Sequence, residues 1–157
     1  MSVLLVSVAI VILDQVTKAM TRNSLELYQS VPVIKNFFHL TYVTNDGIAF
    51  GINVPGGAYL FTLIVLLLTG VVIWYLWLSR NKAFLLRLSL AVILAGAIGN
   101  LLDRVLYGKV VDFLDFMIGS YHWYIFNIAD SAVTVGMGLF LYYSFFRNSK
   151  EQVTTPS

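Results

Sequence analysis

The chain has 157 residues, of which 59% are hydrophobic and 11% are charged, and its mean hydropathy is +0.81. This composition is typical of a membrane protein with room for a single domain. The ten basic and eight acidic residues are spread along the sequence, so no basic block predicts a nucleic-acid partner. The chain has no cysteine, which excludes disulfides, thiolate-ligated zinc and thiol nucleophiles.

Four apolar stretches are long enough to cross a bilayer core of ~30 Å, which takes ~20 helical residues. The second carries no charge and ends in aromatic residues, which favour the headgroup level. The first has no basic n-region and no small-x-small cleavage site, so we expect a retained helix there. The four predicted helices run from Met1 to Met20, Gly56 to Ser79, Ala83 to Leu106 and Ile125 to Phe146.

The segment from Thr21 to Gly57 is too long for a simple turn between the first two helices. Within it, Phe38, Leu40 and Tyr42 alternate with the residues between them at the period of a half-buried strand. The sequence therefore predicts an all-α membrane protein of four transmembrane helices, with a small extracytoplasmic β element between helices one and two.

Basic residues near the helix ends predict the orientation in the membrane. One side of the predicted bundle carries Arg80, Lys82, Arg87, Arg147 and Lys150, and the other carries Arg22, Lys35, Arg104 and Lys109. The first group is crowded into short segments, which favours the cytoplasm for that side. We therefore expect both termini and the tail 147–157 in the cytoplasm, and segment 21–57 outside, within one domain spanning residues 1–157.

Polar residues gather at one end of the predicted bundle. An ionisable group in hydrocarbon costs at least ~2.5–3.5 kcal/mol, so each such residue is a functional hypothesis. In an up-down bundle, the C-terminal ends of helices one and three lie on the same side as the N-terminal ends of helices two and four. The polar residues at these helix ends are Asp14, Lys18, Asn100, Asp103, Arg104, Asn127, Asp130 and Ser131. Asp112 and Asp115 follow in a loop at the same face, near the outer interface. The second helix, with only threonines, is expected to be scaffold.

Several of these residues also have structural interpretations. Asp14 and Lys18 are spaced i, i+4, as are Asn100 and Arg104, and either pair can link neighbouring helices.

Gly96 and Gly99 allow a second helix to approach closely. His39 and His122 have no partner at metal-ligand spacing, and His122 lies among aromatic residues as an interfacial residue would. We expect neither a metal site nor a cofactor.

Asp130 has no basic residue within four positions of it in the sequence. A second carboxyl group that shares its proton would stabilise it, because two close acids do not both ionise cheaply. Asp112 and Asp115 are the candidates, since Asp103 is expected to be balanced by the neighbouring Arg104. The residue pattern leaves the choice between these two open.

Five short motifs, taken together, resemble the bacterial lipoprotein signal peptidase (signal peptidase II) family. They are Asp14-Gln15-Val16-Thr17-Lys18, Asn45-Asp46-Gly47-Ile48-Ala49-Phe50, Gly99-Asn100-Leu101-Leu102-Asp103-Arg104, Val110-Val111-Asp112-Phe113 and Phe126-Asn127-Ile128-Ala129-Asp130-Ser131. The resemblance runs in order from the first helix to the fourth and covers nearly the whole chain.

The resemblance implies a metal-independent aspartic peptidase of the bacterial inner membrane. Such an enzyme cleaves diacylglyceryl-modified prolipoproteins just before the lipidated cysteine, with membrane lipids around it, and we expect a monomer. The two catalytic aspartates fall on Asp112 and Asp130. The supporting positions fall on Asp14, Lys18, Asn45, Gly47, Asn100, Asp103, Arg104, Asn127 and Ala129. Asp46 departs from the family pattern, which more often has a small or basic residue there.

Three other functions fit these residues less well. A small transporter could use Asp14 as a proton site, but the polar groups gather at one interface and do not line a path. A Ser131–Lys18 peptidase dyad needs a neutral lysine, and Asp14 one turn away would keep Lys18 charged. If the protein were a purely structural scaffold, substitutions of Asp112 and Asp130 would be tolerated.

Overall fold

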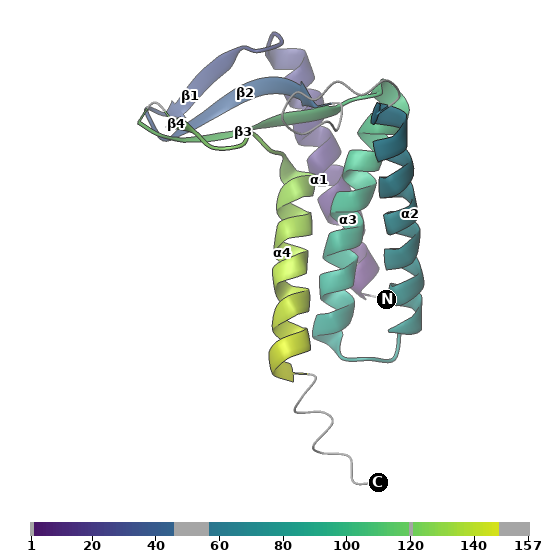
Figure 1. The fold of residues 1–157 in the computed structure, drawn as a ribbon. Coiled ribbons are helices and arrows are strands. Elements are labelled where there is room, and N and C mark those ends of the chain that lie inside the picture. The colour runs from purple at the N-terminus through teal and green to yellow at the C-terminus, as the bar shows by residue number, and fades with distance from the viewer. Residues whose placement is uncertain (1, 46–56, 120, 148–157) are drawn as a thin grey trace, which may run out of the picture.

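In a computed structural model, which describes residues 2–45, 57–119 and 121–147, the chain forms a helical bundle with a small sheet at one end (Figure 1). The helices are α1 (Ser2–Ser24), α2 (Gly57–Leu78), α3 (Phe84–Tyr107) and α4 (Ile128–Tyr142), which continues into the π-helical turn η2 (Tyr143–Arg147). The strands are β1 (Ser30–Ile34), β2 (Phe38–Asn45), β3 (Val110–Ile118) and β4 (Tyr121–His122). Within the described ranges, four helices are long and apolar enough to cross a membrane, as the sequence predicts.

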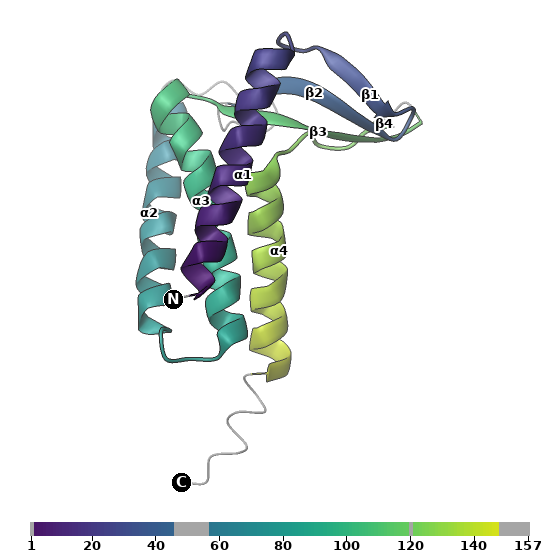
Figure 2. The same ribbon diagram turned by 180° about the vertical axis from the view of Figure 1, so that it is seen from behind.

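Helix α3 is the centre of the bundle and packs against each of the other three helices. Figure 2 shows α1 running across α3, with its upper half beside α4 and its N-terminal end leaning towards α2. Helices α3 and α4 approach each other closely, because a Cβ built on Gly96 would clash with the backbone oxygen of Ala129 and lie 2.7 Å from Cγ2 of Val133. The expected packing role of this glycine is confirmed.

The sheet is antiparallel, with the strand order β1-β2-β3-β4. The predicted strand at Phe38 is confirmed as β2, and it pairs with β3 through partners such as Phe38 with Phe116 and Val43 with Asp112. The predicted β element between the first two helices is only part of this sheet, because β3 and β4 come from the segment between α3 and α4. The first four residues of β3 are all buried, so this strand lacks the apolar–polar alternation that marks a half-buried strand.

Helix α4 begins at Ile128, three residues later than predicted, because Asn127 caps it. The Asn127 side chain accepts a hydrogen bond from the backbone N–H of Asp130 at 2.9 Å, and the Asp130 carboxylate accepts one from the backbone N–H of Asn127 at 3.3 Å. This reciprocal capping box satisfies two amide donors at the helix start. Asp130 therefore lies in the first turn of α4, nearer to the helix start than the predicted bounds place it.

Candidate active site

The polar residues of α1, α3 and α4 converge at the end of the bundle that carries the sheet. A cavity of about 220 Å³ opens there between α2, α3, β2, β3 and the start of α4. Its lining consists of Asn45, Phe61, Asn100, Arg104, Val110, Asp112, Tyr124 and Asp130. Two carboxyl groups, one from a strand and one from a helix, thus face the same space.

Asp112 lies on β3 and is only 2% exposed. Its carboxylate accepts a hydrogen bond of 2.6 Å from Nδ2 of Asn127 and one of 3.3 Å from Nδ2 of Asn45. Burial, followed by the neighbouring charge of Asp130, raises the pKa of Asp112 to about 7, although the two amide donors act in the opposite direction. The Asp112 carboxyl group therefore keeps its proton up to about pH 7, where an ordinary aspartate is ionised.

The Asp130 carboxylate is held by an amide from the neighbouring helix. Its Oδ1 accepts a hydrogen bond of 2.7 Å from Nδ2 of Asn100. The Oδ1 of Asn100 in turn accepts one of 3.2 Å from Nδ2 of Asn127, which also holds Asp112. The two asparagines therefore form a bridge that fixes both carboxyl groups relative to each other.

A buried lysine lies directly behind this bridge. Lys18 is fully buried, and its Nζ lies 2.9 Å from Oδ2 of Asp14 and 3.2 Å from Oδ2 of Asp103. The same ammonium group donates a hydrogen bond of 3.0 Å to Oδ1 of Asn100. This donation orients the Asn100 amide so that its NH₂ group faces Asp130. The expected contact between Asp14 and Lys18 is confirmed.

The expected pairing of Asp103 with Arg104 is wrong. Asp103 contacts Lys18, lies 3.6 Å from Nη1 of Arg22, and accepts a hydrogen bond of 3.0 Å from the backbone N–H of Val111. Consecutive residues on a helix point in different directions, so neighbours in sequence do not pair across one face.

The Arg104 guanidinium lies on the cavity side of α3. It sits 4.9 Å from the centre of the Phe61 ring and donates a hydrogen bond of 3.2 Å to the backbone oxygen of Asn100. Because Phe61 also lines the cavity, α2 contributes to the site and is more than the scaffold predicted for it.

Asp115, the other candidate partner of Asp130, lies outside this cavity. It is fully buried, and its carboxylate accepts a hydrogen bond of 2.6 Å from Oγ1 of Thr41 and lies 2.9 Å from Nδ1 of His122. Asp112 and Asp115 are an odd number of positions apart on β3, which turns them to opposite faces of the strand. The geometry thus groups Asp112 with Asp130.

The Ser131 hydroxyl donates to the backbone oxygen of Asn127 at 2.9 Å, and Lys18 has other partners, so the two do not form a peptidase dyad here. Ala129 donates its backbone N–H to Oδ1 of Asp14 at 2.9 Å. Asp46 and Gly47 lie outside the described residues. Over the residues that the structure describes, no group of three histidine, aspartate or glutamate side chains is placed to hold a metal ion.

Two further residues belong to the site and have no individual role in the sequence analysis. Nε2 of Gln15 lies 3.1 Å from Oδ2 of Asp14 and 3.3 Å from Oδ1 of Asp103, and an amide inside an apolar helix is the signal that marks it. The Tyr124 hydroxyl accepts a hydrogen bond of 2.7 Å from Asn45. Burial raises the pKa of Tyr124, so its phenol remains protonated.

Comparison with known proteins points to one family. The sequence profile described as "Signal peptidase (SPase) II" matches residues 6–146. The lipoprotein signal peptidase of Desulforapulum autotrophicum is 48% identical over 148 residues, which cover 90% of each chain. That of Syntrophus aciditrophicus is 42% identical over 148 residues, which cover 91% of each chain.

Two solved structures of a bacterial membrane enzyme have the same fold. Each superposes with a TM-score of 0.79, at 31% and 33% identity, covering 99% and 93% of this chain and 94% of each solved chain. The chain therefore belongs to the signal peptidase II family, and it is a protease and a multi-pass inner-membrane protein.

The cluster around Lys18 leads to a prediction about stability. Lys18→Met leaves the buried carboxylates of Asp14 and Asp103 without their shared cation, which we expect to cost ~3–5 kcal/mol of unfolding free energy. Arg22→Met removes a partly exposed and more distant cation, and we expect a loss of ~1 kcal/mol or less. Unfolding of the two variants in the same detergent measures both. Equal losses would show that the buried cluster does not depend on Lys18.

Proposed function

We propose that this protein is an aspartic endopeptidase that removes the signal peptide from diacylglyceryl-modified prolipoproteins, cutting just before the lipidated cysteine. The observation that carries this proposal is the pair Asp112 and Asp130, which face one cavity at the end of a membrane bundle and are bridged by two asparagines. Membership of the signal peptidase II family and the names of the relatives supply the substrate class.

Each aspartate has a separate part in the proposed reaction. Asp130 takes a proton from a water held in the cavity, and the water oxygen attacks the scissile carbonyl carbon. Asp112, protonated because of its raised pKa, donates its proton to the carbonyl oxygen. In the second half, Asp130 passes its proton to the leaving nitrogen as the C–N bond breaks, and the diol returns a proton to Asp112. Both groups end as they began, and no covalent intermediate forms.

Arg104 and Asn45 are proposed to hold the substrate beside the two aspartates. Nε of Arg104 is buried and has no hydrogen-bond partner among residues 2–45, 57–119 and 121–147, although the guanidinium borders the cavity. A backbone carbonyl of an extended substrate would satisfy this donor. Asn45 lies between Asp112 and Tyr124 at the cavity wall. The hydrogen bonds and ion pairs described above support the proposed positioning roles of Asp14, Lys18, Asn100, Asp103, Asn127 and Ala129.

We further propose that residues 1–157 form one membrane-embedded peptidase domain that acts as a monomer, with both termini in the cytoplasm. The aspartates and the sheet then lie at the outer face. The basic loop at Arg80 and Lys82, at the opposite end of the bundle, supports this orientation.

The lipid on the substrate should control the rate. Two acyl chains, each CH₂ contributing ~0.8 kcal/mol of anchoring, hold the modified cysteine at the headgroup level. An active site at that level then meets the scissile bond at high effective concentration, and we expect an unlipidated prolipoprotein to be cleaved ~10²-fold or more slowly. Initial rates on both forms in the same bilayers test this. Equal rates would leave a general membrane peptidase and remove the lipoprotein specificity.

Substitution of the aspartates tests the proposed chemistry. Asp112→Asn and Asp130→Asn preserve size but remove proton transfer, so each should lower cleavage of a lipidated prolipoprotein by ~10²–10⁴-fold. The matched control is Asp115→Asn, a buried carboxyl on the same strand that faces away from the cavity, and it should retain most of the activity. Normal turnover by either of the first two variants, with the protein inserted, would refute the assignment.

The pKa of Asp112 predicts the pH dependence of cleavage. Asp112 must carry a proton, so kcat/KM should fall as the pH rises through about 7. Asn45 donates to the Asp112 carboxylate and thereby favours its charged form, so Asn45→Ala should raise the pKa further and move the alkaline limb to higher pH. Asp115→Asn should leave the pH at which kcat/KM falls unchanged. A limb that moves to lower pH in Asn45→Ala would contradict the role given to Asp112.

A further inference from the structure

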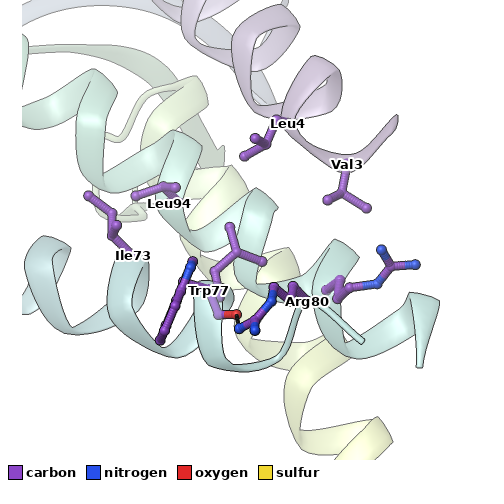
Figure 3. Close-up of a pocket in the computed structure, with 8 residues that line it drawn as sticks. Val3, Leu4, Ile73, Trp77, Arg80 and Leu94 are labelled. Carbon is purple, nitrogen blue, oxygen red and sulfur yellow. Dashed lines mark hydrogen bonds between the residues drawn. The ribbon is translucent and has the colours of Figure 1, made fainter. Parts of the chain in front are cut away.

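A second cavity lies at the end of the bundle opposite the two aspartates. It has a volume of about 360 Å³, within the ~300–1,000 Å³ range of small-molecule pockets. Its apolar walls come from the start of α1, the end of α2 and the first half of α3, namely Val3, Leu4, Ile73, Leu76, Trp77 and Leu94. Figure 3 shows the labelled side chains of these three helices around the cavity, with Arg80 beside Trp77.

Two arginines complete the lining of this cavity. Nε of Arg87 is buried and has no hydrogen-bond partner in the part of the chain that the structure describes. The Arg80 guanidinium lies 4.6 Å from the centre of the Trp77 ring and donates a hydrogen bond of 3.2 Å to the Trp77 backbone oxygen. Among the described residues, no carboxylate lies within 4.0 Å of either arginine. A buried donor on a cation without an acceptor is costly, so the site is complementary to an anion.

The walls of the cavity are accessible from the surroundings of the bundle. Leu4, Ile73 and Trp77 are 53%, 51% and 60% exposed. Helix α2 packs mainly on α3, so the cavity forms a wedge between α1 and α2. An apolar wedge with cationic side chains at the end of a bundle matches a lipid, which has an apolar chain and a charged headgroup.

We propose that this cavity binds an anionic phospholipid, with an acyl chain between α1 and α2 and the phosphate on Arg87 and Arg80. The leaflet follows from the orientation given under the proposed function, which puts this end of the bundle in the cytoplasmic leaflet. The bound lipid fills the wedge and braces α2, which supplies Phe61 to the cavity of the two aspartates.

Native mass spectrometry of the full chain in a neutral detergent tests the site. The protein is titrated with phosphatidylglycerol and with phosphatidylcholine of the same acyl chains. We expect tighter binding of phosphatidylglycerol, and a weakening of about fivefold in Arg87→Gln and in Arg80→Gln. Lys82→Gln is the matched control, because Lys82 is an exposed cation in the same loop outside the cavity lining, and it should bind like the wild type. Arg80 is exposed, so its variant should fold normally even if Arg87→Gln does not.

Four results would overturn the proposal. They are equal binding of the two lipids, unchanged phosphatidylglycerol binding in Arg80→Gln, displacement of the lipid by inorganic phosphate at equal concentration, and a second copy of the chain in place of lipid. Equal binding of the two lipids or an unchanged Arg80→Gln would show that the arginines do not bind the headgroup. Displacement by phosphate would indicate a site for free anions, and a second copy of the chain would indicate a dimer. Because the readout is lipid mass, failure here is distinct from failure of the proposed peptidase activity.

Discussion

Lys18 carries a positive charge in the interior of the bundle, and the arrangement of the site depends on how that charge is balanced. Asp14 and Asp103 flank its ammonium group, and each carboxylate uses its other contacts to hold a backbone amide. Asp14 accepts from the N–H of Ala129, directly before Asp130, and Asp103 accepts from the N–H of Val111, directly before Asp112. One buried cation thereby fixes the backbone next to both aspartates of the candidate site.

This arrangement is better understood as positioning than as stabilisation. Moving charges out of water costs several kcal/mol per ion, and a buried ion pair often gains no more than a well-packed apolar group would. The cluster also restricts its neighbours, since a Cβ on Gly99 would lie 2.7 Å from Oδ2 of Asp14. The charges orient the hydrogen bonds of the site, because Lys18 donates to Asn100 and Asn100 donates to Asp130. The proposed reaction, in which two carboxyl groups share protons, needs such fixed donors.

Much of this architecture was predictable from the sequence, because its signals are local. Four apolar runs predict the four helices, the alternation around Phe38 predicts β2, and the positions of the polar residues along the helices predict that they meet at one end. Strand β3 was not predicted, because its first residues are buried on both faces and show no apolar–polar alternation. Lys18 was not predicted as the partner of Asp103, because this contact depends on how α1 packs against α3, and the residues next to Asp103 in the sequence do not show that packing.

Asp112 and Asp130 are proposed to form one coupled acid–base pair, and the protonation of Asp112 tests this coupling most directly. Difference infrared spectroscopy of the carboxyl C=O stretch, followed across pH in the substrate-free protein, measures that proton. We expect a carboxyl group that titrates near pH 7, that is absent in Asp112→Asn, and whose midpoint falls in Asp130→Asn because the neighbouring charge is lost. A signal near pH 7 that persists in Asp112→Asn, or one that ignores Asp130→Asn, would contradict the coupled pair.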